Sequence, residues 1–208
     1  MSEPTEELAG RCGTVAIIGR PNVGKSTLVN RLVGQKVAIT SRKPQTTRQR
    51  VLGIVTFEGS QLILADTPGW QARPRTAMDK LMNRQIDLAL SEMDAILMLA
   101  DARTWTAADE AVAEVLLGAT CPRFLALNKI DRVPDKSQLL PTLAGLAERL
   151  PSVEIVPISA MKGLGVAQLQ RALVGVMPAR APQFPEEQVT DQSERALAAE
   201  LLREQLMR

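Results

Sequence analysis

Short apolar runs alternate with amphipathic stretches along most of the chain. The first run, residues 14–18, is rich in β-branched side chains and breaks at Gly19, and a helical pattern with Leu28 and Leu32 on one side follows it. Strand, loop and helix therefore follow one another from the start. The alternation continues and predicts helices at 76–90, 108–117, 137–150 and 166–176, and strands at 95–100, 123–127 and 153–157.

Two extended runs, at residues 51–57 and 61–65, are separated only by Glu58, Gly59 and Ser60. This spacing is typical of a β-hairpin with a three-residue turn, so one strand pair is predicted to be antiparallel. Strands that alternate with helices elsewhere predict parallel pairing and right-handed connections. The expected fold class is α/β, with a mostly parallel six-stranded sheet, one antiparallel edge strand and helices on both faces.

Prolines punctuate the chain near its end. Pro182 and Pro185 predict a short linker, and Asp191 followed three residues later by Glu194 resembles the capping box that starts a helix. We expect a tail at 1–12, a domain at 13–180, and a linker with one helix at 181–208. That helix is expected to carry an apolar stripe that nothing obvious covers, made of Leu197, Leu201, Leu202 and Leu206.

Composition narrows the class of protein. Hydrophobic residues make up 45% and charged residues 23% of the 208 residues, which is typical of a soluble globular protein. The chain has no His and only two cysteines, Cys12 and Cys121, so a disulfide framework, Cys/His zinc sites and a histidine general base are excluded. The acidic N-terminus and the shortness of the longest apolar run, residues 95–100, predict no export signal and no membrane anchor. We expect a cytoplasmic protein.

The charge and aromatic content bear on nucleic acid as a partner. A net charge of only +2 predicts no global field that would attract a polyanion. Aromatic residues make up 2% of the chain, which removes the usual stacking platforms for single-stranded bases. Contact with nucleic acid would need a local basic patch.

A phosphate-binding motif lies between the first predicted strand and the first predicted helix. Residues 19–26 read GRPNVGKS, a complete G-x-x-x-x-G-K-[ST] motif in the context that it requires, which a chance glycine-rich turn would not have. Its glycines let backbone N–H groups converge on phosphate oxygens, Lys25 adds a charge at the β and γ phosphates, and Ser26 offers its hydroxyl to Mg²⁺. The predicted nucleotide-binding residues here are Gly19, Arg20, Pro21, Asn22, Val23, Gly24, Lys25, Ser26 and Thr27.

A second motif, DTPG, ends the second hairpin strand. Asp66 is placed to hold Mg²⁺ through water, and the Gly69 N–H is placed to sense the γ-phosphate. An ordinary turn of this composition is the alternative. The predicted nucleotide-binding residues of this motif are Asp66, Thr67, Pro68 and Gly69.

The residues that follow the strands predicted at 123–127 and 153–157 indicate which base is bound. Asp131 can accept from the ring N–H and the exocyclic amine of guanine, which adenine does not offer as a pair, and Asn128 can reach the acceptor edge of the base. The Ala160 N–H can donate to the guanine carbonyl. These residues lie beyond the carboxyl ends of their strands, where doubly wound sheets bind ligands. Their hydrogen-bonding groups match guanine, which is therefore the predicted base. The base-binding residues are Asn128, Lys129, Ile130, Asp131, Ser159, Ala160 and Met161.

Between the first helix and the hairpin, residues 41–50 form a basic segment that contains two threonines. One threonine could complete the Mg²⁺ shell when a γ-phosphate is present and release it after hydrolysis, so this segment is predicted to be a switch. A solvated basic loop is the alternative. The predicted switch and effector residues are Gln45, Thr46, Thr47, Arg48 and Gln49.

With these motifs the chain resembles the Era/TrmE-like, translation-factor-related GTPases, and most closely the Era family of bacterial ribosome-assembly GTPases. The likeness covers nearly the whole chain. It rests on GRPNVGKSTLVN, SRKPQTTRQR, DTPGW, ARTWTAADE, NKID, VPISAMKG and FPEEQVTDQSERALAAELLREQLMR.

The resemblance implies a P-loop NTPase G domain that binds GTP or GDP with Mg²⁺ and hydrolyses GTP. Thr47 best matches the magnesium-ligating threonine, beside Ser26 and Asp66, with Thr46 as the alternative. Asn22 matches a position that ligates K⁺ in cation-dependent relatives, or else only shapes the loop. Trp70 stands where classical switch GTPases have a water-positioning Gln, so slow hydrolysis is expected. The residues expected to act in catalysis are Lys25, Thr47, Gly69 and Asn22.

The resemblance also implies partners. Era-like proteins act on the small ribosomal subunit and its 16S rRNA, and continue into a KH domain that binds RNA, so this chain is expected to end in the first helix of that domain and to have weak or no RNA affinity. A monomer is expected, with peripheral association at the inner face of the cell membrane left open. The alternatives are a GTP-gated binding module for another partner and a P-loop kinase.

Overall fold

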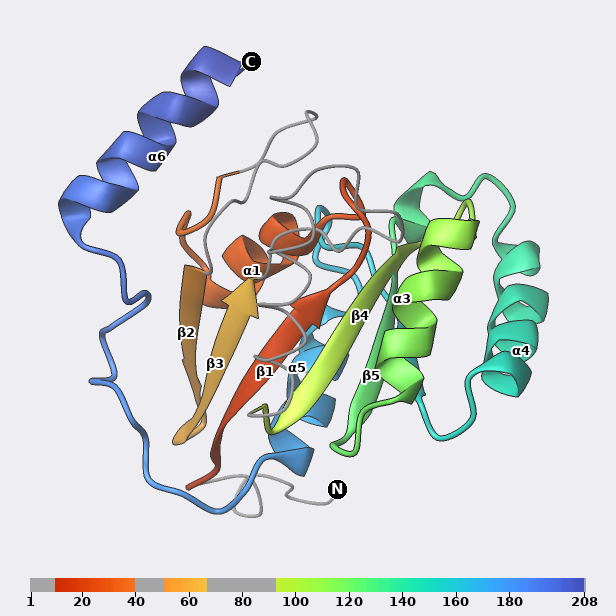
Figure 1. The fold of residues 1–208 in the computed structure, drawn as a ribbon, viewed down its shortest axis with the longest axis horizontal. Helices are drawn as coiled ribbons and strands as arrows, with labels where there is room; N and C mark the ends of the chain where they lie inside the picture. The colour runs from red at the N-terminus through yellow and green to blue at the C-terminus, as the bar shows by residue number, and fades with distance from the viewer. Residues whose placement is uncertain (1–9, 40–50, 67–92, 208) are drawn as a thin grey trace.

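A six-stranded sheet with the order β2-β3-β1-β4-β5-β6 forms the centre of the protein (Figure 1). The structure is a computed structural model and describes residues 10–39, 51–66 and 93–207. Only the pair β2 and β3 is antiparallel, and the four other pairs are parallel. The predicted α/β fold with one antiparallel edge strand is therefore confirmed. The strands are β1 (Cys12–Ile18), β2 (Val51–Phe57), β3 (Ser60–Asp66), β4 (Ala95–Asp101), β5 (Arg123–Asn128) and β6 (Glu154–Pro157).

Helices cover both faces of the sheet, as the sequence predicts (Figure 1). On one face α1 (Lys25–Val33) and α5 (Val166–Val176) pack on a core that includes Leu28, Leu64 and Leu169. On the other face α3 (Ala107–Leu117) and α4 (Leu139–Arg149) pack on a second core that includes Leu116 and Leu146. Because both faces are covered, all seven residues of β4 are buried, which explains its uninterrupted apolar sequence.

Two short 3₁₀ turns complete the described elements before the C-terminal helix. They span Ile130–Arg132 and Lys136–Gln138, and the second one replaces the first turn of the helix predicted at 137–150. The helix predicted at 76–90 lies outside the described residues. None of the described helices is both long enough and apolar enough to cross a membrane.

The hairpin turn is shorter than the sequence predicts. Ser60 pairs with Phe57 within the sheet, so only Glu58 and Gly59 form the turn. Both have positive φ, 48° for Glu58 and 73° for Gly59, as a type I′ turn requires. The expected three-residue turn was wrong because Ser60 is fully buried as the first residue of β3.

The linker after α5 runs along the outer edge of β2 (Figure 1). Its contacts begin at the buried Gln61, whose Oε1 accepts from the Phe184 N–H at 3.0 Å. Farther along, the Ile54 N–H donates to the Val189 carbonyl at 2.9 Å, and the Leu52 N–H donates to the Asp191 carboxylate at 3.2 Å. The linker thus occupies hydrogen-bonding groups that an edge strand would otherwise present.

The C-terminal helix α6 (Glu194–Met207) forms, but its start differs from the expected capping box. Ser193 Oγ accepts from the Ala196 N–H at 3.3 Å, whereas Asp191 is engaged with β2. The expected apolar stripe is partly covered: Leu197 and Leu201 are half-buried, and Leu202 and Leu206 are exposed.

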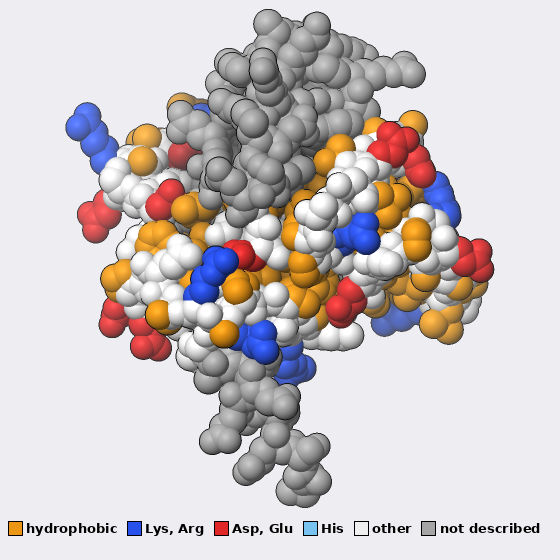
Figure 2. Space-filling model, turned by 60° about the horizontal axis from the view of Figure 1, so that its bottom comes forward, with side chains coloured by type: hydrophobic (Ala, Val, Ile, Leu, Met, Phe, Trp, Pro, Cys, Tyr) orange, Lys and Arg blue, Asp and Glu red, His pale blue; other side chains and the backbone are white. Residues whose placement is uncertain are grey.

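Basic and acidic side chains are interspersed over the described part of the face in Figure 2. This agrees with the net charge of +2.

Candidate functional site

The phosphate-binding motif forms the loop between β1 and α1. Gly19 has φ 147° and Gly24 has φ 109°, which side chains disfavour. A Cβ at Gly19 would lie 2.6 Å from the Leu99 carbonyl oxygen, and one at Gly24 would lie 2.4 Å from Asn128 Nδ2. Both motif glycines are therefore required by close approaches of neighbouring strands to the loop.

The N-terminus of α1 points its first N–H groups at this loop. The helix begins at a glycine cap without a side chain, and its first turn carries no acidic residue. The first N–H groups of a helix lack partners within the helix and carry the positive end of its dipole. This end of α1 therefore suits an anion such as a phosphate.

Lys25 is buried and points back into the loop. Its Nζ donates to the carbonyl oxygens of Gly19 at 2.9 Å and of Arg20 at 3.2 Å. Burial lowers the pKa of Lys25 from 10.5 to about 8, although the Asp66 carboxylate opposes this shift. The ammonium is thus held among oxygen dipoles, where a polyphosphate would stabilise its charge.

The lowered pKa of Lys25 predicts that the protein without nucleotide becomes more stable as the pH rises from 8 to 10. Above about pH 8 the native lysine loses its proton while the unfolded lysine, with a pKa of 10.5, keeps it. The unfolded state then binds more protons, so the free energy of unfolding rises with pH, by up to about 3 kcal/mol over the whole window. Urea unfolding at pH 7 and pH 10 tests this against Lys25→Met, whose stability should lack this rise; equal pH dependence in both proteins would contradict it.

Two of the predicted magnesium ligands lie next to each other. Ser26 Oγ donates to Asp66 Oδ2 at 2.8 Å, and Asp66 is fully buried at the carboxyl end of β3. A hydroxyl and a carboxylate are hard oxygen donors, and Mg²⁺ in nucleotide sites uses one or two such side chains plus phosphates and waters. The pair fits the proposed ion.

Asn128 ties three segments of the site together. Its Nδ2 donates to the Val23 carbonyl of the phosphate loop at 2.8 Å, and its Oδ1 accepts from the Ala160 N–H at 2.9 Å. The Ala160 N–H, which the sequence predicts to donate to the guanine carbonyl, donates to Asn128 in this structure. The amide of Asn128 joins the phosphate loop to the loop after β6, and its own contact with the base remains a prediction.

Lys129 and Asp131, which follow Asn128, differ in their surroundings. Lys129 has φ 69°, and its Nζ donates to the Asn22 carbonyl at 2.7 Å and to Asp101 at 2.9 Å. Asp131 is exposed, and its carboxylate accepts no hydrogen bond from the part of the chain that the structure describes. Asp131 is thus available to a ligand, as its predicted role requires.

Asp101 is a residue of the site that the sequence did not reveal. Burial disfavours its charge, but hydrogen bonds from Arg103 and Lys129 outweigh this and hold the pKa of Asp101 well below its usual range. Asp101 therefore stays ionised and anchors Lys129. Its place at the carboxyl end of a buried strand was the signal that could have identified it.

The loop after β6 carries Ser159, Ala160 and Met161 and is fixed to α1. Arg31 donates through Nε to the Ala160 carbonyl at 3.0 Å and through Nη2 to the Met161 carbonyl. Ser159 Oγ accepts from the Lys162 N–H at 3.1 Å, which closes the turn. The side chain of Met161 itself is exposed. Arg31 was not predicted as a site residue.

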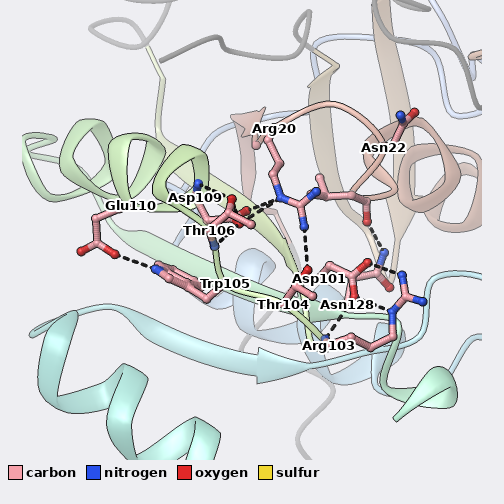
Figure 3. A network of polar contacts seen from close by, with 12 residues as sticks. Arg20, Asn22, Asp101, Arg103, Thr104, Trp105, Thr106, Asp109, Glu110 and Asn128 are labelled. Carbon is pink, nitrogen blue, oxygen red and sulfur yellow. Dashed lines mark hydrogen bonds and ion pairs between the residues drawn. The ribbon is translucent and has the colours of Figure 1, made fainter. Parts of the chain in front are cut away.

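Arg20 and Asn22 mark two sides of the phosphate loop (Figure 3). Arg20 reaches the N-terminal turn of α3, where it pairs with Asp109 at 2.8 Å. Asn22 has φ 65° and is exposed, and asparagine tolerates the left-handed region better than most residues. This conformation gives a physical reason for the alternative that Asn22 shapes the loop.

Several predicted residues lie outside the described part of the chain. They comprise the switch and effector residues Gln45, Thr46, Thr47, Arg48 and Gln49, and also Thr67, Pro68, Gly69 and Trp70. The described site therefore consists of the phosphate loop, the Ser26 and Asp66 pair, and the two loops after β5 and β6.

Comparison with known proteins gives a consistent result. Residues 14–129 match the family described as 50S ribosome-binding GTPase. GTPase Era of Azotobacter vinelandii is 50% identical over 204 residues, which are 98% of this chain and 68% of that protein. GTPase Era of Ectopseudomonas mendocina is 49% identical over the same shares of both chains.

Solved structures of Era are also similar to this chain. The crystal structure of Era in complex with MgGDPNP and nucleotides 1506–1542 of 16S ribosomal RNA has a TM-score of 0.87 and 39% identity, over 93% of this chain and 66% of that one. Aquifex aeolicus Era in a variant bound to GDP and AlF4⁻ gives the same values. This chain spans about two thirds of the length of these relatives.

Proposed function

Because the chain belongs to the Era family of GTPases, we propose that it is a GTP-binding and slowly GTP-hydrolysing switch that acts in maturation of the small ribosomal subunit. Such a switch signals through the difference in conformation between its GTP-bound and GDP-bound states. Guanine nucleotide with Mg²⁺ is the ligand, and Era in complex with MgGDPNP and 16S rRNA nucleotides supports both this ligand and the RNA partner.

One observation carries the nucleotide assignment. Asn128 connects the phosphate loop at Val23 to the base loop at Ala160, and Asp131 lies exposed three residues farther on. The buried side chain of Asn128 therefore joins the loop that would bind the phosphates to the loop that would bind the base. The Asp131 carboxylate lies where the guanine N–H groups are expected. This arrangement favours a guanine nucleotide over an adenine nucleotide.

The same site offers groups that could bind the metal and act on the phosphates. Ser26 and Asp66 would hold Mg²⁺, with Thr47 or Thr46 completing its shell in the GTP state. When bound, Mg²⁺ neutralises charge on the β and γ phosphates. Lys25 would stabilise the same charge, and the Gly69 N–H would sense the γ-phosphate. Trp70 stands where classical switch GTPases have a water-positioning Gln, so slow turnover is expected.

The proposal also includes a potassium site at Asn22. A cation beside the phosphate loop would neutralise charge that develops during phosphoryl transfer, as an arginine finger does elsewhere. Asn22 is exposed at the loop, where such an ion would have to lie.

Turnover of GTP and ATP in potassium and in sodium tests these assignments together. We expect hydrolysis of GTP only, at a rate that is roughly ten times higher in K⁺ than in Na⁺ if a monovalent cation supplies transition-state charge. Phosphate release by the purified chain with Mg²⁺ measures both effects. Equal rates in the two salts would remove the potassium site alone, and equal ATP turnover would refute the guanine assignment.

The ribosomal role rests on the segment 181–208. The relatives extend beyond the length of this chain, and Leu202 and Leu206 are exposed on α6, which suits the first helix of a KH-type RNA-binding domain. We propose that a protein made of this chain followed by such a domain binds 16S rRNA in the cytoplasm as a monomer, and that this chain alone binds it weakly. Association with the inner face of the cell membrane would be peripheral.

A further inference from the structure

We propose that Asp109, on α3, is a positioning residue for the phosphate loop: it holds Arg20, and thereby the carbonyl groups that set the place of Lys25. This inference rests on the proposed nucleotide function, because it assigns a role in the same site. It starts from the contacts in Figure 3, where Arg20 leaves the loop and turns toward α3.

The contact between Arg20 and Asp109 is close and shielded from solvent. Arg20 Nε lies 2.8 Å from Oδ1 and 2.9 Å from Oδ2 of Asp109, and its Nη2 donates to Thr104 Oγ1 at 3.2 Å. The Asp109 side chain is fully buried, and that of Arg20 is 21% exposed. Such a pair has little freedom to rearrange.

The cap of α3 does not by itself require this charge. Thr106 Oγ1 accepts from the Asp109 N–H, and Asp109 Oδ2 accepts from the Thr106 N–H at 2.9 Å and from the Thr106 hydroxyl at 2.7 Å. A neutral amide or hydroxyl could accept that second bond equally well. Burying a carboxylate is unfavourable unless a cation pairs with it, and such pairs are poor sources of stability. The helix dipole favours a negative charge in the first turn of α3, and Arg20 supplies the cation that compensates for the burial of this carboxylate.

The position of Arg20 affects Lys25 through two backbone carbonyl groups of the phosphate loop. The carbonyl oxygens of Gly19 and Arg20 are the acceptors of Lys25 Nζ, so a side chain that fixes Arg20 also fixes where the ammonium lies. Without this anchor the loop could shift its carbonyl groups and its N–H groups together.

The other side of the loop is held from the same segment. Lys129 donates to the Asn22 carbonyl and is itself paired with Asp101. Asp101 is the last residue of β4 and Asp109 lies in the first turn of α3. Thr104 between them donates its N–H to the Asp101 carbonyl at 3.1 Å. The segment 101–109 therefore anchors the phosphate loop directly at Arg20 and, through Lys129, at Asn22.

The test removes the charge and keeps the cap. In Asp109→Asn the amide oxygen can still accept from the Thr106 N–H, but Arg20 loses its anion. We expect release of a fluorescent GDP analogue to become about tenfold faster, as for residues coupled within one network. Arg20→Met should have the same effect, and the double variant should be no worse than either single one.

Glu110→Gln is the matched control, because Glu110 is the next residue and contacts Trp105 and Arg149 but not the loop. It should release GDP at the rate of the unaltered protein. A purely structural role of Asp109 would lower the melting temperature without changing GDP release. Release unchanged in folded Asp109→Asn, or in Arg20→Met if the first variant does not fold, would overturn the inference.

Hydrogen exchange of the nucleotide-free protein separates this inference from the proposed function. We expect the N–H groups of residues 20 and 22–25 to exchange at least several-fold faster in Asp109→Asn and in Arg20→Met, while those in the middle of α3 keep their protection. Unchanged exchange in the loop overturns the positioning role whatever the ligand is. An unaltered protein that binds no GDP, with faster loop exchange in the variants, would refute the proposed function alone.

Discussion

Asp131→Asn is expected to exchange the preference for guanine nucleotides for a preference for xanthine nucleotides. Asp131 is exposed beyond β5, and its carboxylate accepts no hydrogen bond from the described residues. It is proposed to accept from two N–H groups of guanine, and an asparagine would turn one acceptor into a donor facing a donor. A site built for such hydrogen bonds rejects a mismatched ligand by roughly 10³-fold or more. Xanthine carries an oxygen in place of the exocyclic amine and restores the match.

Competition of GTP and XTP against a fluorescent GDP analogue measures this change. Asp135→Asn is a suitable control, because Asp135 is another exposed aspartate nearby that only caps the 3₁₀ turn Lys136–Gln138. It should leave the preference as it is. If Asp131→Asn still prefers GTP, the assignment of the base contact is wrong.

The second large effect is expected from Lys25→Met, which should abolish most GTP turnover and yet stabilise the protein without nucleotide. Loss of a preorganised charge at the transferring phosphate lowers rates by roughly 10²- to 10³-fold. In the absence of phosphate the same ammonium is buried, which lowers its pKa to about 8. Its removal relieves a penalty of up to about 3 kcal/mol at neutral pH.

Single-turnover hydrolysis and urea unfolding at pH 7, both with the same protein samples, give the two results. The expected outcome is a slower but more stable protein, the usual relation between a strained site and its function. A variant that is slower and also less stable would show that Lys25 holds the empty loop together, contrary to the electrostatic argument.

Much of the fold could be predicted because its determinants are local. The β4 sequence is apolar at nearly every position because helices cover both faces of the sheet, and the phosphate loop is recognised by glycines that close approaches require. The errors also have local causes. Glu58 takes a left-handed conformation that its residue type disfavours, and Asp191 bonds to β2 instead of capping α6.

The anchors of the site could not be predicted because they are non-local. Thr106-x-x-Asp109 can be read from the sequence as a capping box, but the partner of Asp109 lies 89 positions away at Arg20. In the same way Asp101 acquires a role only through Lys129, 28 positions later. Motifs identify the residues that touch a ligand, whereas the residues that hold those motifs in place appear only in the folded chain.

The linker along β2 has a consequence for solubility. A chain shortened to end at residue 180 would keep every strand of the sheet and every described residue of the nucleotide site. It would also lose the linker groups that accept from the Leu52 and Ile54 N–H groups. An uncovered edge strand is a template on which a second molecule can add its own strand. We therefore expect a chain cut at residue 180 to self-associate more readily than one that keeps residues 181–191.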